Sequence, residues 1–226
     1  MPIPSRYNSL QRQVIEVANG WLSSETLPAC VFDTESTGLG DGQEIIEITI
    51  IDVNGQVLLD TLVKPSIPIP AESTAFHGIT DAMVGNAPTW PEIHDQVIAA
   101  FLGRTVLAYS FGFDLQLLRA MAKMHGLAMP AETVNSEHIV MLEGGTVIQC
   151  VMRAYAVLWQ ESTTNERSTG GFRWKRLGDA CHSQGIDASG AHRAKADCEM
   201  TLSLIKAMAS SPAVFADAKA RAKVLN

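Results

Sequence analysis

A strand-like segment followed at once by a tight turn limits most strongly what this chain can fold into. Residues 44–53 are rich in β-branched side chains, which favour extended structure. Asn54 and Gly55 follow directly, and a strand pattern resumes over residues 56–63. An Asn-Gly pair between two such runs is a strong signal for an antiparallel hairpin. The chain is therefore expected to contain a β-sheet with at least one antiparallel pair.

Strand and helix patterns alternate along the rest of the chain. Residues 29–32 and 105–109 are apolar runs that predict two further strands, and a proline-rich loop follows the hairpin at residues 65–70. We expect helices over residues 9–22, 80–84, 91–102, 114–125, 146–160, 174–183 and 192–208. The polar residues 161–171 have no apolar period and predict a loop. This order predicts an α/β fold whose mixed sheet carries an antiparallel hairpin and is flanked by helices.

The length and composition fit one main domain. With 226 residues, of which 46% are hydrophobic, the chain is long enough for one large domain with a buried core. We expect residues 1–28 to form an N-terminal helical extension, residues 29–209 the main domain and residues 210–226 a C-terminal helical tail. No apolar run approaches the roughly 18 residues of a membrane-spanning helix, and no secretory signal is evident. We therefore expect a soluble, cytoplasmic protein without a membrane partner.

Charge and cysteine usage argue against two classes of protein. Seventeen Lys and Arg residues against 24 Asp and Glu residues give a net charge of −7, which disfavours a protein that coats nucleic acid through a broad basic face. An enzyme that holds a few nucleotides through metal ions stays open. The four cysteines are widely separated, so they predict buried apolar side chains rather than a zinc site or a disulfide framework.

Two acids lie where the first predicted strand ends. Asp33 and Glu35 are two positions apart, so on a strand both side chains point to the same face, about 6–7 Å apart along the chain. Two carboxylates beside an apolar interior need cations to stay ionised, and hard divalent metals prefer oxygen ligands. The pair predicts a metal site; for this motif taken alone, solvated acids at a strand end are the alternative.

Three more residues can complete such a site. Asp114 follows the predicted strand at residues 105–109, where an acid in the first turn of a helix is the alternative reading. His192 and Asp197 are five residues apart, and five steps along a helix rotate the chain by about 500°, which leaves them about 140° apart. They can therefore serve one site only if His192 precedes the helix and Asp197 lies in its first turns. The pair Ser189-Gly190 supplies that break.

In their order and spacing, these motifs resemble those of the DEDDh 3′–5′ exonucleases of the RNase H-like superfamily, which include the proofreading subunit of bacterial DNA polymerase III, RNase T and oligoribonuclease. The resemblance runs from about Cys30 to Ala207. Its motifs are residues 32–39, 44–48, 76–80, 113–114 and 191–197. The resemblance implies an RNase H-like mixed sheet.

Carried over position by position, the resemblance makes four acids the ligands of two Mg²⁺ or Mn²⁺ ions: Asp33, Glu35, Asp114 and Asp197. Four carboxylates balance the charge of two divalent cations, and two such ions can hold the attacking water and the departing oxygen of an in-line displacement. The resemblance makes His192 the general base. The reference pKa of histidine, near 6.5, suits that task around neutral pH.

The resemblance also assigns a segment to the terminal nucleotide: Thr34, Ser36, Thr37, Gly38 and Leu39. Gly38 permits close approach of the backbone, and Leu39 can wedge against the last base. Phe113 is a candidate for stacking on a base, and His77 for contacting the terminal sugar or phosphate. For Leu39 and Phe113, an ordinary place in the core is the alternative.

The sequence departs from the family pattern in two places. Tyr109-Ser110 stands where family members usually have His-Asn, and Asn135-Ser136 where they often have Asp-Thr. Neither change removes an expected metal ligand or the expected general base. The first concerns the residues that would hold the scissile phosphate and its neighbours.

Basic and aromatic residues alternate near the end of the polar stretch. They are Arg167, Phe172, Arg173, Trp174, Lys175 and Arg176. Such a mixture suits a single strand of nucleic acid, because bases stack on aromatic rings and phosphates pair with cations. A solvated loop is the alternative.

The residues and the resemblance together predict a metal-dependent 3′–5′ exonuclease that releases nucleoside 5′-monophosphates from the 3′ ends of single-stranded or frayed DNA. An RNA exonuclease of the RNase T or oligoribonuclease type is the first alternative. A non-catalytic module on the same fold, which binds nucleic acid or a partner, is the second. A polymerase or another processing protein is a candidate partner, with the N-terminal helix and the tail as candidate docking elements.

Overall fold

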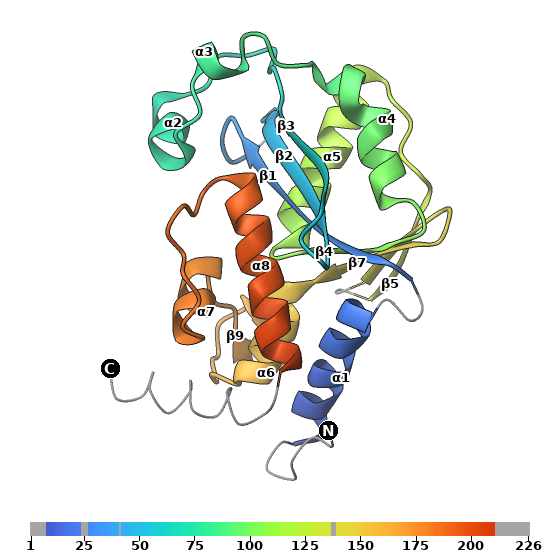
Figure 1. Ribbon diagram of the computed structural model, residues 1–226, viewed down its shortest axis with the longest axis vertical. Coiled ribbons are helices and arrows are strands. Elements are labelled where there is room, and N and C mark those ends of the chain that lie inside the picture. The colour runs from blue at the N-terminus through green and yellow to red at the C-terminus, as the bar shows by residue number, and fades with distance from the viewer. Residues whose placement is uncertain (1–7, 24–26, 41, 137–138, 211–226) are drawn as a thin grey trace.

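The computed structural model describes residues 8–23, 27–40, 42–136 and 139–210, and its centre is a seven-stranded mixed sheet (Figure 1). The strands are β1 (Ala29–Ser36), β2 (Ile45–Asp52), β3 (Val57–Leu62), β4 (Thr105–Ala108), β5 (Glu132–Ser136), β6 (Ile139–Leu142) and β7 (Thr146–Cys150). Their order in the sheet is β3-β2-β1-β4-β7-β6-β5. The strands β1, β4 and β7 run parallel, and the pairs at both ends of the sheet are antiparallel.

The predicted hairpin joins β2 to β3. Two backbone N–H groups of the turn, those of Asn54 and Gln56, donate to the carboxylate of Asp52 at 2.8 Å. Gly55 has a φ of 88°, a left-handed conformation that glycine adopts without a steric penalty. The mixed sheet with its antiparallel hairpin is therefore confirmed, and local turn chemistry explains where it begins.

Eight helices surround the sheet in the described part of the chain. They are α1 (Ser9–Ser23), α2 (Ala71–His77), α3 (Asp81–Val84), α4 (Trp90–Phe101), α5 (Phe111–His125), α6 (Val151–Trp159), α7 (Leu177–Ser183) and α8 (Ala194–Ala209). α1, α6, α7 and α8 share one apolar core with the sheet, and α4 and α5 share another (Figure 1). None of these helices is long and apolar enough to cross a bilayer.

Side chains along β1 alternate between the two cores, and this alternation positions the site. Val31 packs in the core with α8, and Phe32 packs in the core with α5. Because side chains two positions apart share a face of a strand, Asp33 and Glu35 continue the row of Val31 toward α8. Thr34 continues the row of Phe32 toward α5.

The helix predicted over residues 146–160 is wrong in its first part. Residues 146–150 form β7, which pairs with β4 on one side and β6 on the other, and the helix α6 begins only at Val151. Thr146, Val147 and Ile148 are β-branched and fit a strand as well as an apolar helix face. Pairing with two distant strands decides the conformation.

Other differences are smaller. The strands β5 and β6 and the helix α2 carry no sequence prediction, and the predicted loop over residues 161–171 contains part of a short hairpin, β8 (Ser168–Thr169) with β9 (Phe172–Arg173). The last predicted helix begins at Ala194, not at residue 192. The four cysteines are free and buried, as predicted. Of the predicted tail, residues 211–226 lie outside the described residues.

The N-terminal helix α1 packs against the main domain, and this predicts its contribution to stability. Trp21 is 5% exposed in the core with α8, and its indole N–H donates to the Gln149 side chain at 3.2 Å. Trp21→Ala is expected to lower the free energy of unfolding by about 3–5 kcal/mol. Urea denaturation measures the change. Leu10→Ala, on the exposed side of the same helix, is the matched control, with an expected change within about 0.5 kcal/mol; equal losses for the two variants would contradict the packing.

Candidate active site

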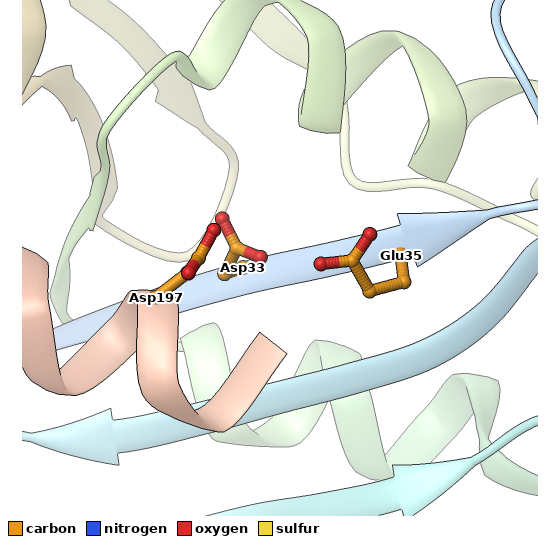
Figure 2. A group of neighbouring side chains, drawn as sticks. All are labelled: Asp33, Glu35 and Asp197. Carbon is orange, nitrogen blue, oxygen red and sulfur yellow. The ribbon is translucent and has the colours of Figure 1, made fainter. Parts of the chain in front are cut away.

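Three acids from two elements converge at one point. Asp33 and Glu35 come from β1, and Asp197 comes from the first turns of α8 (Figure 2). One carboxylate oxygen from each lies within 4.8 Å of the other two, a spacing that one metal ion can bridge. Figure 2 shows the Asp197 carboxylate beside that of Asp33, with Glu35 reaching toward them from further along β1.

Asp114 lies near this group but is held differently. It is buried in the first turn of α5, and one of its carboxylate oxygens accepts a 2.7 Å hydrogen bond from the Thr34 hydroxyl. It does not belong to the group whose oxygens all lie within 4.8 Å, but it lines the same pocket and its charge acts on Asp33. The four predicted ligands are therefore brought together, with Asp114 at the edge of the group.

The electrostatics of these acids favour a cation among them. Burial raises the pKa of Asp33 well above its usual value, and the charges of Asp114, Asp197 and Glu35 raise it further. Burial, followed by repulsion from Asp197, raises the pKa of Glu35 to about 8. Burial also raises the pKa of Asp114 to about 7, against the hydrogen bond from Thr34, and raises the pKa of Asp197. A divalent cation stabilises the ionised form of all four, and an all-oxygen donor set suits Mg²⁺ or Mn²⁺.

His192 lies on the turn before α8, as the rotation argument requires. Its φ is 70°, and its backbone N–H donates to Asp197 at 3.1 Å. Its exposed imidazole packs against the ring of Phe76, with the ring centroids 3.8 Å apart. His192 is thereby attached to a predicted metal ligand through its backbone, while its ring remains at the surface of the pocket.

A pocket of about 660 Å³ adjoins the acids, and all the residues assigned to the terminal nucleotide line it. They are Thr34, Ser36, Thr37, Gly38, Leu39, His77 and Phe113. Leu39 is 85% exposed, so an ordinary place in the core is wrong for this residue. Phe113 is half-buried and packs partly against the core, and its stacking on a base stays a prediction. Gly38 has a φ of 157°, and an added Cβ would lie 3.0 Å from the Gln43 side-chain oxygen.

Sequence reasoning missed one wall of this pocket. The helix α2 contributes Glu72, Ser73 and Phe76, and the Ser73 hydroxyl donates to the backbone oxygen of Thr37 at 2.8 Å. This bond fixes α2 beside the segment after β1. Phe76 lies inside the motif at residues 76–80, and its exposure of 61% beside the ring of His192 distinguishes it from a core residue. The short length of α2 left no helical period to detect.

The departures from the family pattern have structural consequences. The Tyr109 hydroxyl donates to the backbone oxygen of Lys175 at 2.8 Å, which ties the segment before α7 to the pocket wall. Ser110 is the N-cap residue of α5. The tyrosine therefore holds protein backbone at a position where family members usually place a histidine.

The basic and aromatic residues after the polar stretch are partly used within the protein. Glu161 pairs with Lys175 at 3.0 Å and with Arg173 at 3.5 Å. The Arg153 guanidinium lies over the Trp174 ring, 4.9 Å from its centroid. These contacts occupy Arg173, Trp174 and Lys175 within the protein, so fewer groups are left for a nucleic-acid strand than the sequence indicates.

The comparisons with known proteins agree with this geometry. The sequence model of the exonuclease family matches residues 30–205. The chain is 41% identical over 197 residues to the uncharacterized exonuclease CP81 of Escherichia phage 186, a match that covers 87% of this chain and 94% of that protein.

Two further relatives extend the comparison. The chain is 44% identical over 102 residues to a DNA polymerase III subunit epsilon-like protein of Rhodobacter capsulatus, covering 42% of this chain but 14% of that longer protein. A solved structure, exonuclease X in complex with 5′ overhanging duplex DNA, aligns with a TM-score of 0.51 at 25% identity, over 84% of this chain and 99% of the other.

The raised carboxyl pKa values predict how stability depends on pH and metal. Between the usual pKa values, 4.5 for Glu35 and 3.8 for Asp114, and the raised values of about 8 and about 7, the folded protein holds protons that the unfolded chain has released. The metal-free protein is therefore expected to lose stability as pH rises from about 4 to 8. Mn²⁺ binds the ionised carboxylates, so it is expected to restore stability most strongly near pH 8.

Thermal unfolding with EDTA or Mn²⁺ across this pH range measures both effects. Glu35→Gln removes one of the repelling charges, so it should flatten the pH dependence of the metal-free protein and reduce the stabilisation by Mn²⁺. A metal-free protein whose stability rises toward pH 8 would contradict the electrostatic account.

Proposed function

The chain belongs to the exonuclease family, and from that membership we propose that it is a DEDDh 3′–5′ exonuclease that removes nucleoside 5′-monophosphates from the ends of single-stranded or frayed DNA. The observation that carries the proposal is the convergence of carboxylate oxygens from Asp33, Glu35 and Asp197 within 4.8 Å beside one pocket. Asp114 and His192 line that pocket too. A non-catalytic module would have no need to keep all five positions filled.

The four acids suit a pair of divalent cations, which we propose to be Mg²⁺ or Mn²⁺. Asp33, Glu35 and Asp197 would hold them most directly, with Asp114 at the edge of the group. Bound there, the ions would supply Lewis-acid stabilisation for the attacking and departing oxygens of an in-line displacement. The protein's own contribution is to hold like charges close together on rigid elements, so that little reorganisation accompanies binding.

His192 is proposed to take the proton from the attacking water. Its ring is exposed at the pocket surface, and its place on a turn gives the imidazole more freedom than the acids on β1 have. Histidine is the side chain that most often serves as a general base. The residues assigned to the terminal nucleotide would bring its phosphate to this point.

DNA is the proposed substrate because two relatives point to it. The aligned exonuclease X structure holds duplex DNA with a 5′ overhang, and the Rhodobacter capsulatus relative is named for a DNA polymerase subunit. An RNA exonuclease is the alternative within the same chemistry, and the 2′-OH distinguishes the two. Association with a polymerase or another processing partner and action in the cytoplasm stay predictions.

The direct test is digestion of matched 5′-labelled DNA and RNA strands, single and double, with Mg²⁺, Mn²⁺ or EDTA. We expect ladders that shorten from the 3′ end, faster on single-stranded DNA than on RNA, and no cleavage in EDTA. Faster loss of RNA would favour the alternative substrate, and a sample inert toward every strand with Mn²⁺ would refute the proposed activity.

The proposed base predicts a separation of catalysis from binding. His192→Ala should lower kcat by about 100-fold to 10,000-fold, because proton transfer is lost, while Mn²⁺ affinity and the Michaelis constant change little. Single-turnover kinetics measure the loss of catalysis, and calorimetry measures the Mn²⁺ affinity. Asp114→Asn is the comparison variant, and it should weaken Mn²⁺ binding and activity together. Near-normal turnover in His192→Ala would remove the assignment.

A further inference from the structure

A fifth acid lies beside the site and is not one of the four proposed metal ligands. Glu47 lies on β2, directly opposite Glu35 in the antiparallel register of β1 and β2. Its side chain is 6% exposed and emerges on the face of the sheet that α8 covers. A buried carboxylate in such a place needs partners, because burial disfavours an unpaired charge.

The partners of Glu47 are the residues at the start of α8. The Arg193 side chain donates through Nε to both carboxylate oxygens, at 3.2 and 3.1 Å, and through Nη2 to Oε1 at 2.5 Å. The backbone N–H of Ala194 donates to Oε2 at 2.9 Å. Both oxygens of Glu47 are therefore engaged by two adjacent residues that lie 146 and 147 positions away in the sequence.

These contacts provide the cap that α8 lacks locally. Arg193 is the N-cap residue, and its side chain makes no capping hydrogen bond to the helix. The N–H groups of a first helical turn have no partner within the helix, and that end of the helix carries a partial positive charge. Glu47 supplies both an acceptor for Ala194 and a negative charge from across the sheet.

The same contacts hold His192 from one side. Its φ of 70° lies in the left-handed region, which an L-residue adopts only where its surroundings require it. On one side its own N–H is bound to Asp197, and on the other the next two residues are bound to Glu47. The imidazole itself has only the exposed Phe76 ring beside it among its described ring contacts.

We propose that Glu47 is a positioning residue for the general base: by binding Arg193 and the first N–H of α8, it sets the backbone that presents His192 to the pocket. This inference rests on the proposed exonuclease function. A direct part in metal binding is the competing explanation, and the engagement of both carboxylate oxygens by Arg193 and Ala194 argues against it.

Glu47→Gln is the test variant and Asp60→Asn its matched control. Asp60 also places a carboxylate near the start of α8, 3.6 Å from Lys195, and it accepts its hydrogen bond from the Thr49 hydroxyl rather than from the turn that carries His192. Both changes replace a carboxylate with an amide, so they remove one negative charge and keep one oxygen as a hydrogen-bond acceptor. Arg193→Lys, which keeps the charge but loses the planar fork, provides a second route if Glu47→Gln does not fold.

A double-mutant cycle separates positioning from general stability. Glu47→Gln should lower kcat by about 10-fold to 100-fold with the Michaelis constant and Mn²⁺ affinity within about threefold. Asp60→Asn should change kcat by less than about twofold. In a His192→Ala background, Glu47→Gln should lower kcat by less than about twofold, because the side chain that Glu47 positions is already absent. The inference would be overturned if the kcat losses of the two single variants multiplied in the double variant. A fall in Mn²⁺ affinity equal to the fall in kcat would also overturn it.

An NMR measurement that does not depend on nuclease activity tests this inference separately from the proposed function. In the metal-free protein, the Phe76 ring should shift the His192 imidazole signal upfield in the NMR spectrum, with Phe76→Leu as the unstacked reference. Glu47→Gln should move the signal toward that reference, and Asp60→Asn should not. An unmoved signal in Glu47→Gln would overturn the positioning role, whereas a wild-type protein inert on all strands would refute only the exonuclease.

Discussion

Repulsion between acids that the sheet keeps close together is the constraint on which the rest of the structure depends. Asp33 and Glu35 cannot separate, because β1 is paired with β2 along its length and with β4 at its start. Val31, in the same row of β1, packs in the apolar core, so on that side the acids have protein rather than water beside them. The pKa values of both acids are raised because burial and the neighbouring carboxylates, which this backbone geometry imposes, disfavour the ionised form.

The helix α8 has to approach this charged strand closely, and its sequence permits the approach. Cys198 is fully buried, and its thiol contacts the backbone oxygens of Thr49 at 3.4 Å and Val31 at 3.8 Å. Ala194 is also fully buried at the start of the helix. Small side chains on this face bring the helix backbone near the sheet, which lets the short Asp197 side chain reach Asp33. The buried cysteine thus serves packing, as its isolation in the sequence predicts.

Local patterns predicted the parts of the structure that local physics decides. The Asn-Gly turn, the shared face of Asp33 and Glu35 and the placement of His192 before a helix follow from turn chemistry and from the periods of strand and helix. The strand β7 could not be predicted, because its apolar residues fit a helix as well and only pairing with β4 and β6 decides. The wall formed by α2 was missed for a related reason, since seven residues carry too little periodicity.

Contacts between residues far apart in the sequence were the hardest to predict from the sequence. Thr34 and Asp114 are 80 residues apart, and their hydrogen bond depends on the opposite faces of β1 and on the place of α5. The contacts between Glu47 and the start of α8 span 146 residues or more. No role for residues 44–48 could therefore be predicted from the sequence, although they form one of the family motifs. Its meaning appears only when the register of β1 and β2 places Glu47 opposite Glu35.

The acids and the histidine are held by different kinds of contact, and this difference follows from what each has to do. The acids lie on a paired strand and a packed helix, where a shift of position would break backbone hydrogen bonds. The His192 ring instead shares the Phe76 surface with the pocket, so any ligand that fills the pocket competes for that contact. The two backbone anchors, at Asp197 and Glu47, do not involve the ring. The position of the imidazole therefore depends more on the start of α8 than on the ring it touches.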